Sequence, residues 1–242
     1  MQDLFTKLKA EFIFNFIEGA RWKYITNGLA VTLEVTVLSL LLGLCIGVIV
    51  AMIRSSYDKN RDNMLPGPGK TLFAAANAIC RVYLTVIRGT PVVVQLLIGY
   101  FVIFITTTNT VMVATLVFGF ISGAYITEII RGGIMSIDEG QFEAGRSLGF
   151  NYIQTMRYVI IPQTIKNVLP SLANEFIALL KETSVAGYVA VQDLTKGGDI
   201  IRSRTYSPFM PLIAVALIYL VLVMFFSKLV SILERRLRNS EH

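Results

Sequence analysis

The chain has 242 residues, of which 54% are hydrophobic and only 16% are charged. A soluble domain contains about a quarter charged residues, and the apolar residues form blocks as long as the roughly 20 residues that cross a bilayer. The sequence therefore excludes a soluble globular class and predicts an all-α polytopic membrane protein, in which the net charge of +6 reflects membrane topology rather than nucleic-acid binding.

Residues 1–24 are predicted to form an amphipathic helix at the membrane surface. Apolar side chains recur there on one helical stripe, namely Phe5, Leu8, Phe12, Phe16 and Ala20. Trp22 and Tyr24 follow, as aromatic residues often do at a membrane interface. We expect a packing or anchoring face here and a transmembrane domain over residues 25–242.

The first membrane span is predicted at residues 27–53. Gly43 and Gly47 stand four residues apart in it, a spacing that lets another helix approach closely, so we interpret the pair as a packing contact. Residues 54–70 are polar and rich in Pro and Gly, and are predicted to form a loop. The part from 58 to 70 has no functional interpretation.

No catalytic or metal site is predicted in this chain. Gly69-Lys70-Thr71 imitates the end of a phosphate-binding loop, but Met64 stands where that loop needs glycine, so we exclude nucleotide binding. Cys45 and Cys80 have no metal-ligand spacing and are expected to be unpaired thiols among helices. The single histidine is His242, and no Ser/His or Cys/His constellation is present.

Four further spans are predicted, giving five in total, at residues 82–105, 110–130, 169–191 and 207–233. Between the third and fourth spans lies the one long polar segment, 136–162. Lys and Arg are more frequent on the side of the membrane that holds this segment, which predicts a cytoplasmic segment 136–162, an outside N-terminus and a cytoplasmic C-terminus.

Segment 136–162 is predicted to form a helical hairpin of two short helices. Ser136, followed by Glu139, has the spacing of a capping box, and Gly149 stands where a left-handed C-terminal cap would end the first helix. Asn151 can cap the second helix, with a glutamine three residues later, and Pro162 tends to stop or kink a helix. A polar hairpin at a membrane face is typical of a docking element.

The same residues resemble the signature of ATP-binding-cassette importer permeases, E-A-A, three residues, G, nine residues, I-x-L-P. Glu143, Ala144, Gly149 and Pro162 match it with the same spacing, while Gly145, Val159 and Ile161 depart from it by small or apolar exchanges. Gly145 lowers the intrinsic stability of the first helix by roughly 1 kcal/mol. The resemblance implies that this segment couples the chain to a separate ATPase through Glu143, Ala144, Gly145, Gly149 and Pro162. Glu143-Ala144-Gly145 is expected to offer a nearly side-chain-free surface that lets the partner's backbone come close.

Further stretches resemble the polar amino acid uptake branch of these permeases: Asn27-Gly28-Leu29, Arg88-Gly89-Thr90-Pro91 through Gln95, Ala124-Tyr125 with Glu128 and Arg131-Gly132-Gly133, and Leu179 to Ser184. The resemblance implies a pair of permease subunits, identical or related, that work with two ATPase subunits holding ATP and Mg. It also implies an extracellular or periplasmic amino-acid-binding protein as a partner.

Charged side chains inside spans are costly unless they are paired or line a wet cavity, so each is a candidate for the substrate pathway. The candidates, with polar neighbours on the fourth span, are Glu128, Asn174, Glu175, Lys181, Glu182 and Ser184. The alternative is that Lys181, Glu182 and Arg88 form salt bridges between helices. Glu128 could equally serve a cytoplasmic gate.

The sequence thus predicts a permease subunit in a bacterial cytoplasmic membrane that imports a polar amino acid by alternating access, in contact with lipid and without nucleic acid. One alternative is a secondary transporter driven by an ion gradient, although we find no internal repeat of the kind such proteins show. A structural subunit of a larger membrane complex is the other.

Overall fold

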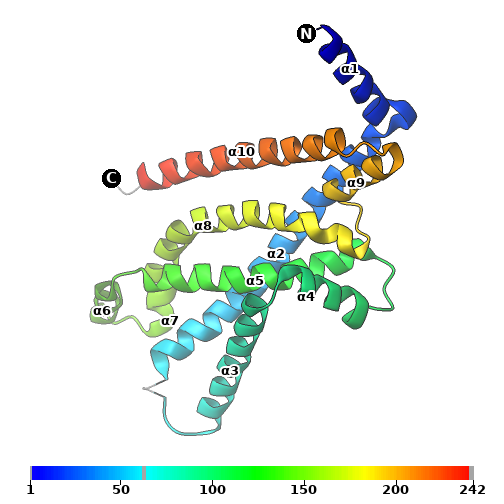
Figure 1. The fold of residues 1–242 in the computed structure, drawn as a ribbon. Coiled ribbons are helices and arrows are strands. Elements are labelled where there is room, and N and C mark those ends of the chain that lie inside the picture. The colour runs from blue at the N-terminus through cyan, green and yellow to red at the C-terminus, as the bar shows by residue number, and fades with distance from the viewer. Residues whose placement is uncertain (1, 62–63, 240–242) are drawn as a thin grey trace. The chain divides into compact units, whose positions relative to one another are not determined.

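The structure, a computed structural model, describes residues 2–61 and 64–239 (Figure 1). His242 lies outside these residues. Every regular element in the described part of the chain is helical. The α-helices are α1 (Gln2–Phe12), α2 (Trp22–Asn60), α3 (Pro68–Gly89), α4 (Val92–Ile98), α5 (Thr110–Met135), α6 (Glu139–Ser147), α7 (Tyr152–Thr155), α8 (Ile161–Glu182), α9 (Leu194–Thr205) and α10 (Phe209–Asn239).

Four helices in the described ranges are long and apolar enough to cross a membrane: Trp22–Lys59, Pro68–Gly89, Thr110–Met135 and Phe209–Leu237. They confirm the predicted all-α membrane class. The predicted fourth span, 169–191, coincides with α8 and the 3₁₀ segment Thr183–Val189. Because α8 carries the four charged residues Lys166, Glu175, Lys181 and Glu182, the number of five spans stays a prediction.

Two predicted boundaries are wrong. The predicted loop at 54–70 is helical at both ends, since α2 continues to Asn60 and α3 begins at Pro68, a residue well suited to the first helical turn. The predicted continuous span 82–105 is interrupted after Gly89. Pro91 favours an extended residue before it, and Thr90 has φ −121° and ψ 149°. The chain resumes as α4 and a π-helical turn, Gly99–Ile103.

The chain divides into two compact units, each assembled from three stretches. The first unit contains Met1–Ser39, Val92–Phe118 and Ile177–Lys228, and the second contains Leu40–Pro91, Gly119–Phe176 and Leu229–His242. Segment 136–162 lies wholly in the second unit. The helices α2, α5, α8 and α10 contribute residues to both.

The core of the first unit joins the N-terminal segment to α9 and α10. Phe16, Ile25, Leu194, Ile201 and Val215 form one buried cluster. Buried Asn15 accepts a hydrogen bond from the Thr205 hydroxyl at 2.9 Å. Phe16 is 7% exposed, whereas Phe5 and Phe12 of the predicted apolar stripe are 73% and 51% exposed. The end of the stripe nearer α2 therefore packs on protein, and a membrane anchor over residues 1–24 stays a prediction.

In the second unit, small residues bring α2 and α5 together. A Cβ atom at Gly47 would lie 2.5 Å from Ile126 Cγ2, and one at Gly43 would lie 3.0 Å from Ser122 Cβ. Any side chain at these two positions would therefore separate the helices. The interpretation of Gly43 and Gly47 as a packing contact is confirmed.

Asp193 begins α9 and provides a pH-dependent contribution to the stability of the first unit. Its carboxylate accepts hydrogen bonds from Thr195 N at 3.1 Å and Lys196 N at 3.0 Å, and the residue is 1% exposed. It lies between the predicted spans 169–191 and 207–233. Burial raises the pKa of this carboxyl from 3.8 to about 6, although the hydrogen bonds oppose the shift.

We expect the stability of the parent protein to fall as pH rises from 3.8 to about 6. The folded state binds the Asp193 proton more tightly than the unfolded chain, so the stabilisation is complete below pH 3.8 and lost as pH passes about 6. Asp193→Asn keeps a good cap and removes the titration. Thermal unfolding in detergent between pH 4.5 and 7 should show a smaller pH dependence for the variant; equal slopes would contradict the assignment.

Candidate functional site

Helix α6 of segment 136–162 begins at Glu139 and is capped by Asp138, not by Ser136. An Asp138 side-chain oxygen accepts a hydrogen bond from Gly140 N at 2.7 Å and caps the helix. The Ser136 hydroxyl instead donates to Gly133 O at 2.8 Å and accepts from Asn167 Nδ2 at 3.2 Å. The predicted capping box at Ser136 is therefore wrong, because Ser136 still bonds to the end of α5 and an acidic residue two positions later is available.

Helix α6 is terminated by Gly149, two residues after its last residue Ser147, in the left-handed conformation at φ 81°. Phe150 N donates to Gly145 O at 3.0 Å, and Gly149 N donates to Arg146 O at 2.9 Å. This pair of reversed hydrogen bonds is a Schellman motif, which satisfies the last carbonyl groups of the helix. The turn direction after α6 therefore depends on a conformation that suits glycine.

The second helix of the segment begins at a capping box and is longer than predicted. The Asn151 side chain accepts from Gln154 N, and the Gln154 side chain accepts from Asn151 N, both at 2.9 Å. A π-helical turn, Met156–Ile160, precedes Pro162. Proline cannot donate to the carbonyl four residues earlier, and the wider turn accommodates it, so the chain continues into α8. The prediction of a second short helix is wrong.

Glu143 and Ala144 are among the exposed residues of α6, whereas Gly145 is buried. On the other face, Ile137, Phe142 and Ile160 form a small buried core. A Cβ atom at Gly145 would lie 2.7 Å from Thr155 Cγ2. The absence of a side chain at Gly145 therefore serves packing of α6 on α7, which Figure 1 shows side by side. Gly145 thus lies against Thr155 rather than on the exposed surface of α6, and its part in coupling to the ATPase stays a prediction.

We expect Gly145→Ala, which restores the second alanine of the signature, to destabilise the hairpin. Overpacking against Thr155 costs roughly 1–3 kcal/mol, which exceeds the gain in helix propensity of about 1 kcal/mol. Thr155→Ala in the same chain should recover the loss. A double-mutant cycle on thermal unfolding would measure this coupling, and strictly additive effects would contradict it.

Charged side chains connect the base of α6 to α5 and α3 within the second unit. Lys59 Nζ lies 2.9 Å from the centroid of the Phe142 ring. The preceding residue, Asp58, lies 3.9 Å from Arg131, which also pairs with Glu128 at 3.2 Å. Arg88 approaches the same Glu128 oxygen at 3.9 Å. The last turn of α2, predicted as loop, thus contacts both α6 and this charge cluster.

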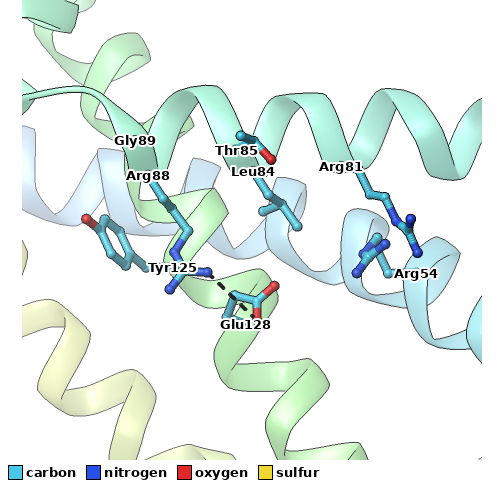
Figure 2. Close-up of a pocket in the computed structure, with 8 residues that line it drawn as sticks. All are labelled: Arg54, Arg81, Leu84, Thr85, Arg88, Gly89, Tyr125 and Glu128. Carbon is cyan, nitrogen blue, oxygen red and sulfur yellow. Dashed lines mark ion pairs between the residues drawn. The ribbon is translucent and has the colours of Figure 1, made fainter.

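A cavity of about 590 Å³ lies beside the charge cluster (Figure 2). Its residues come from α2, α3 and α5: Arg54, Arg81, Leu84, Thr85, Arg88, Gly89, Tyr125 and Glu128. Figure 2 shows Arg88 and Tyr125 near Glu128 at one end and Arg54 and Arg81 at the other. The Arg88 guanidinium lies 5.8 Å from the centroid of the Tyr125 ring, within the range of a cation–π contact.

Residues 71–239 match the family described as the binding-protein-dependent transport system inner membrane component. The chain belongs to this family. It is thus the multi-pass inner-membrane permease of an importer, a part that is not an enzyme. Such systems work with a separate ATPase and a substrate-binding protein.

Relatives match nearly the whole permease. A Rickettsia bellii protein, provisionally named glutamine transport system permease protein GlnP, is 37% identical over 88% of this chain and 93% of its own length. The arginine transport system permease protein ArtQ of Bacillus subtilis is 33% identical over 90% of this chain and 94% of its own. A crystal structure of an amino acid ABC transporter is 38% identical, with a TM-score of 0.78 over 91% of this chain and 98% of that chain.

The permease's six predicted pathway residues fall in different units. Glu128, Asn174 and Glu175 belong to the second unit, and Lys181, Glu182 and Ser184 to the first. Glu175 accepts a hydrogen bond from the Ser122 hydroxyl at 2.9 Å, and Asn174 is exposed. Lys181 and Glu182 form no ion pair with any described residue within 4 Å. Their assembly into one pathway stays a prediction.

Sequence reasoning missed the permease's Arg54, Arg81, Asp58 and Lys59 as site residues. Arg54, Asp58 and Lys59 were missed because residues 54–70 were predicted as a loop, whereas 54–60 form the last part of α2. Arg81 has a signal in the sequence, because Arg81, Thr85 and Arg88 recur at spacings of four and three and so share one face of α3. That face lines the cavity.

Proposed function

We propose that this permease imports a polar amino acid and that segment 136–162 couples its movement to ATP hydrolysis by a separate ATPase subunit. The observation that carries this proposal is similarity over almost the whole chain to permeases named for glutamine and arginine transport. The identity of the amino acid is left to experiment.

The geometry of α6 supports a coupling role. Glu143 and Ala144 are exposed on a helix that is capped at both ends and fixed by the buried Phe142. ATP binding would bring two ATPase subunits together, each bound to the α6 helix of one permease subunit. The two permease subunits would then rotate relative to each other between inward-open and outward-open states. Such coupling requires a stiff connection, which the Gly149 motif and the helix through Pro162 supply. ATP and Mg would be held by the ATPase.

The partners and orientation follow the same proposal. A second permease subunit, identical or related, would complete the pathway, and an extracellular or periplasmic amino-acid-binding protein would deliver the substrate. Segment 136–162 and the C-terminus would face the cytoplasm, and residues 1–24 would lie outside as a surface helix. A polar or charged side chain within a membrane span is costly unless it is paired or lines a water-filled cavity. The proposed pathway residues are therefore Glu128, Asn174, Glu175, Lys181, Glu182 and Ser184.

Reconstitution tests this function. The permease would be co-expressed with its ATPase and binding protein, and uptake of a panel of labelled amino acids would be measured in proteoliposomes. We expect uptake of one polar amino acid that disappears without ATP. Uptake that follows an ion gradient without ATP would favour a secondary transporter instead. An assembly that forms but moves no amino acid would favour a structural subunit.

A further inference from the structure

The two ends of the cavity in Figure 2 differ in charge balance. Among the described residues that line it, Glu128 is the one carboxylate. Glu128 is already shared between Arg131 at 3.2 Å and Arg88 at 3.9 Å. Within the described part of the chain, no carboxylate lies within 4 Å of a cationic nitrogen of Arg54 or Arg81. One end of the cavity is therefore neutralised, and the other carries two guanidinium groups without a counter-ion.

The two arginines at the end of the cavity without a counter-ion, Arg54 and Arg81, have N–H groups available to donate further hydrogen bonds. Arg54 donates from one terminal nitrogen to Asn77 Oδ1 at 3.1 Å, while its Nε is buried and has no partner in the described part of the chain. Figure 2 shows Arg81 of α3 pointing toward this end of the cavity, where Arg54 of α2 also lies. Two like charges facing one cavity repel each other, and an oxyanion between them would remove the repulsion and accept the unused donors.

The surroundings of the cavity indicate which oxyanion fits. Ile79, Val82 and Val86 stand on another side of α3 and are 70%, 62% and 52% exposed. They line an apolar groove of about 500 Å³ formed by residues of α3 on both sides of Arg81 in the sequence, from Ala78 to Ile87. A ligand that fills both features carries a negative head and a long apolar tail. Basic pockets between membrane helices are suited to the head groups of acidic lipids.

We infer that Arg54 and Arg81 bind the phosphodiester head group of an anionic phospholipid, whose acyl chains lie along the apolar side of α3. Arg54 directly follows the predicted first span, 27–53, at the end expected to be cytoplasmic, so the lipid belongs to the inner leaflet. This leaflet assignment rests on the proposed function and its orientation. The binding of lipid rests on the charges and the groove alone.

Native mass spectrometry tests the inference on the permease purified with its ATPase in mild detergent. The purified complex would be exposed to equal amounts of phosphatidylglycerol and phosphatidylcholine, and the bound lipids would be counted. We expect the parent to retain phosphatidylglycerol preferentially. Arg81→Gln should lower that retention about fivefold, since a basic side chain near an anionic lipid contributes about 1 kcal/mol. Arg81→Lys should retain most of it.

Arg235→Gln is the matched control, because Arg235 is an exposed arginine at the end of α10 that does not line the cavity. It should leave retention unchanged. Arg81 is exposed, so its replacement is expected to leave folding intact, and Arg54→Gln provides a second variant at the same end of the cavity. Unchanged retention in both cavity variants would overturn the inference.

A competition experiment with a soluble phosphate ester distinguishes binding of a whole lipid from binding of its phosphate group alone. Glycerol 3-phosphate should fail to displace phosphatidylglycerol at equal concentration, because it cannot occupy the groove; equal competition would overturn the lipid assignment. The readout uses neither ATP nor substrate. A failed lipid test therefore leaves the proposed transport untouched, and failed transport with retained lipid bears only on the proposed function.

Discussion

Replacing Gly149 with valine is expected to uncouple uptake from ATP hydrolysis while the permease still inserts into the membrane. Gly149 has φ 81°, and a β-branched residue in the left-handed region costs on the order of 1–3 kcal/mol. An added Cβ would meet no atom within 4 Å, so the effect would come from backbone strain alone. Relief of that strain changes the turn between α6 and α7, and with it the direction of the exposed face. Uptake should fall at least about tenfold, the equivalent of 1.4 kcal/mol.

Gly149→Asn is the matched control, because asparagine tolerates the left-handed conformation far better than valine. Its uptake should stay close to that of the parent. The ATPase of the reconstituted complex gives the second readout, since uncoupling predicts loss of its stimulation by substrate-loaded binding protein. Substrate-stimulated ATPase at the parent level in Gly149→Val would show that this turn is not part of the coupling connection.

Glu143→Lys is expected to release the ATPase from the permease. Glu143 is exposed at the centre of α6, and it forms no hydrogen bond or ion pair with a described residue that its replacement would break. Reversing a charge inside a docking surface removes favourable pairs and leaves their partners unpaired, which costs roughly 2–5 kcal/mol. The dissociation constant of the ATPase should therefore rise by about thirtyfold or more.

Co-purification through an affinity tag on the ATPase measures this release, with membrane insertion checked separately. Gln141→Lys adds a positive charge two residues earlier, on a different face of α6, and should leave the complex intact. That control separates the local requirement at Glu143 from general repulsion of a more basic hairpin. An ATPase that stays bound to Glu143→Lys as firmly as to the parent would remove Glu143 from the proposed docking surface.

Local features of the segment followed closely from the sequence. The left-handed cap at Gly149 and the capping box of Asn151 with Gln154 depend on residues within a few positions of one another, so their chemistry can be recognised in the chain itself. The cap at Asp138 was missed because two capping candidates stand two residues apart. Which one begins the helix depends on whether Ser136 still bonds to the end of α5.

Boundaries near the membrane surface were harder to predict. Hydropathy falls after Ile53, yet α2 continues to Asn60, because a polar helix needs only its own backbone hydrogen bonds and a packing partner. Lys59 on Phe142 and Asp58 near Arg131 provide that partner. The helix break before Pro91, by contrast, has a signal in the sequence, because proline favours an extended residue before it. The prediction of a continuous span gave more weight to the apolar composition of residues 82–105 than to this proline.

By itself the sequence determined the membrane class, the family resemblance and the local chemistry of the hairpin turn, because these depend on composition and on residues close together in the chain. Only the tertiary structure decided what each small or charged residue contacts. Gly145 packs against Thr155, and Arg54 of α2 and Arg81 of α3 line one cavity in which no carboxylate of a described residue lies within 4 Å of either guanidinium. Contacts of that kind depend on how helices pack against one another, which the order of residues along a single helix does not specify.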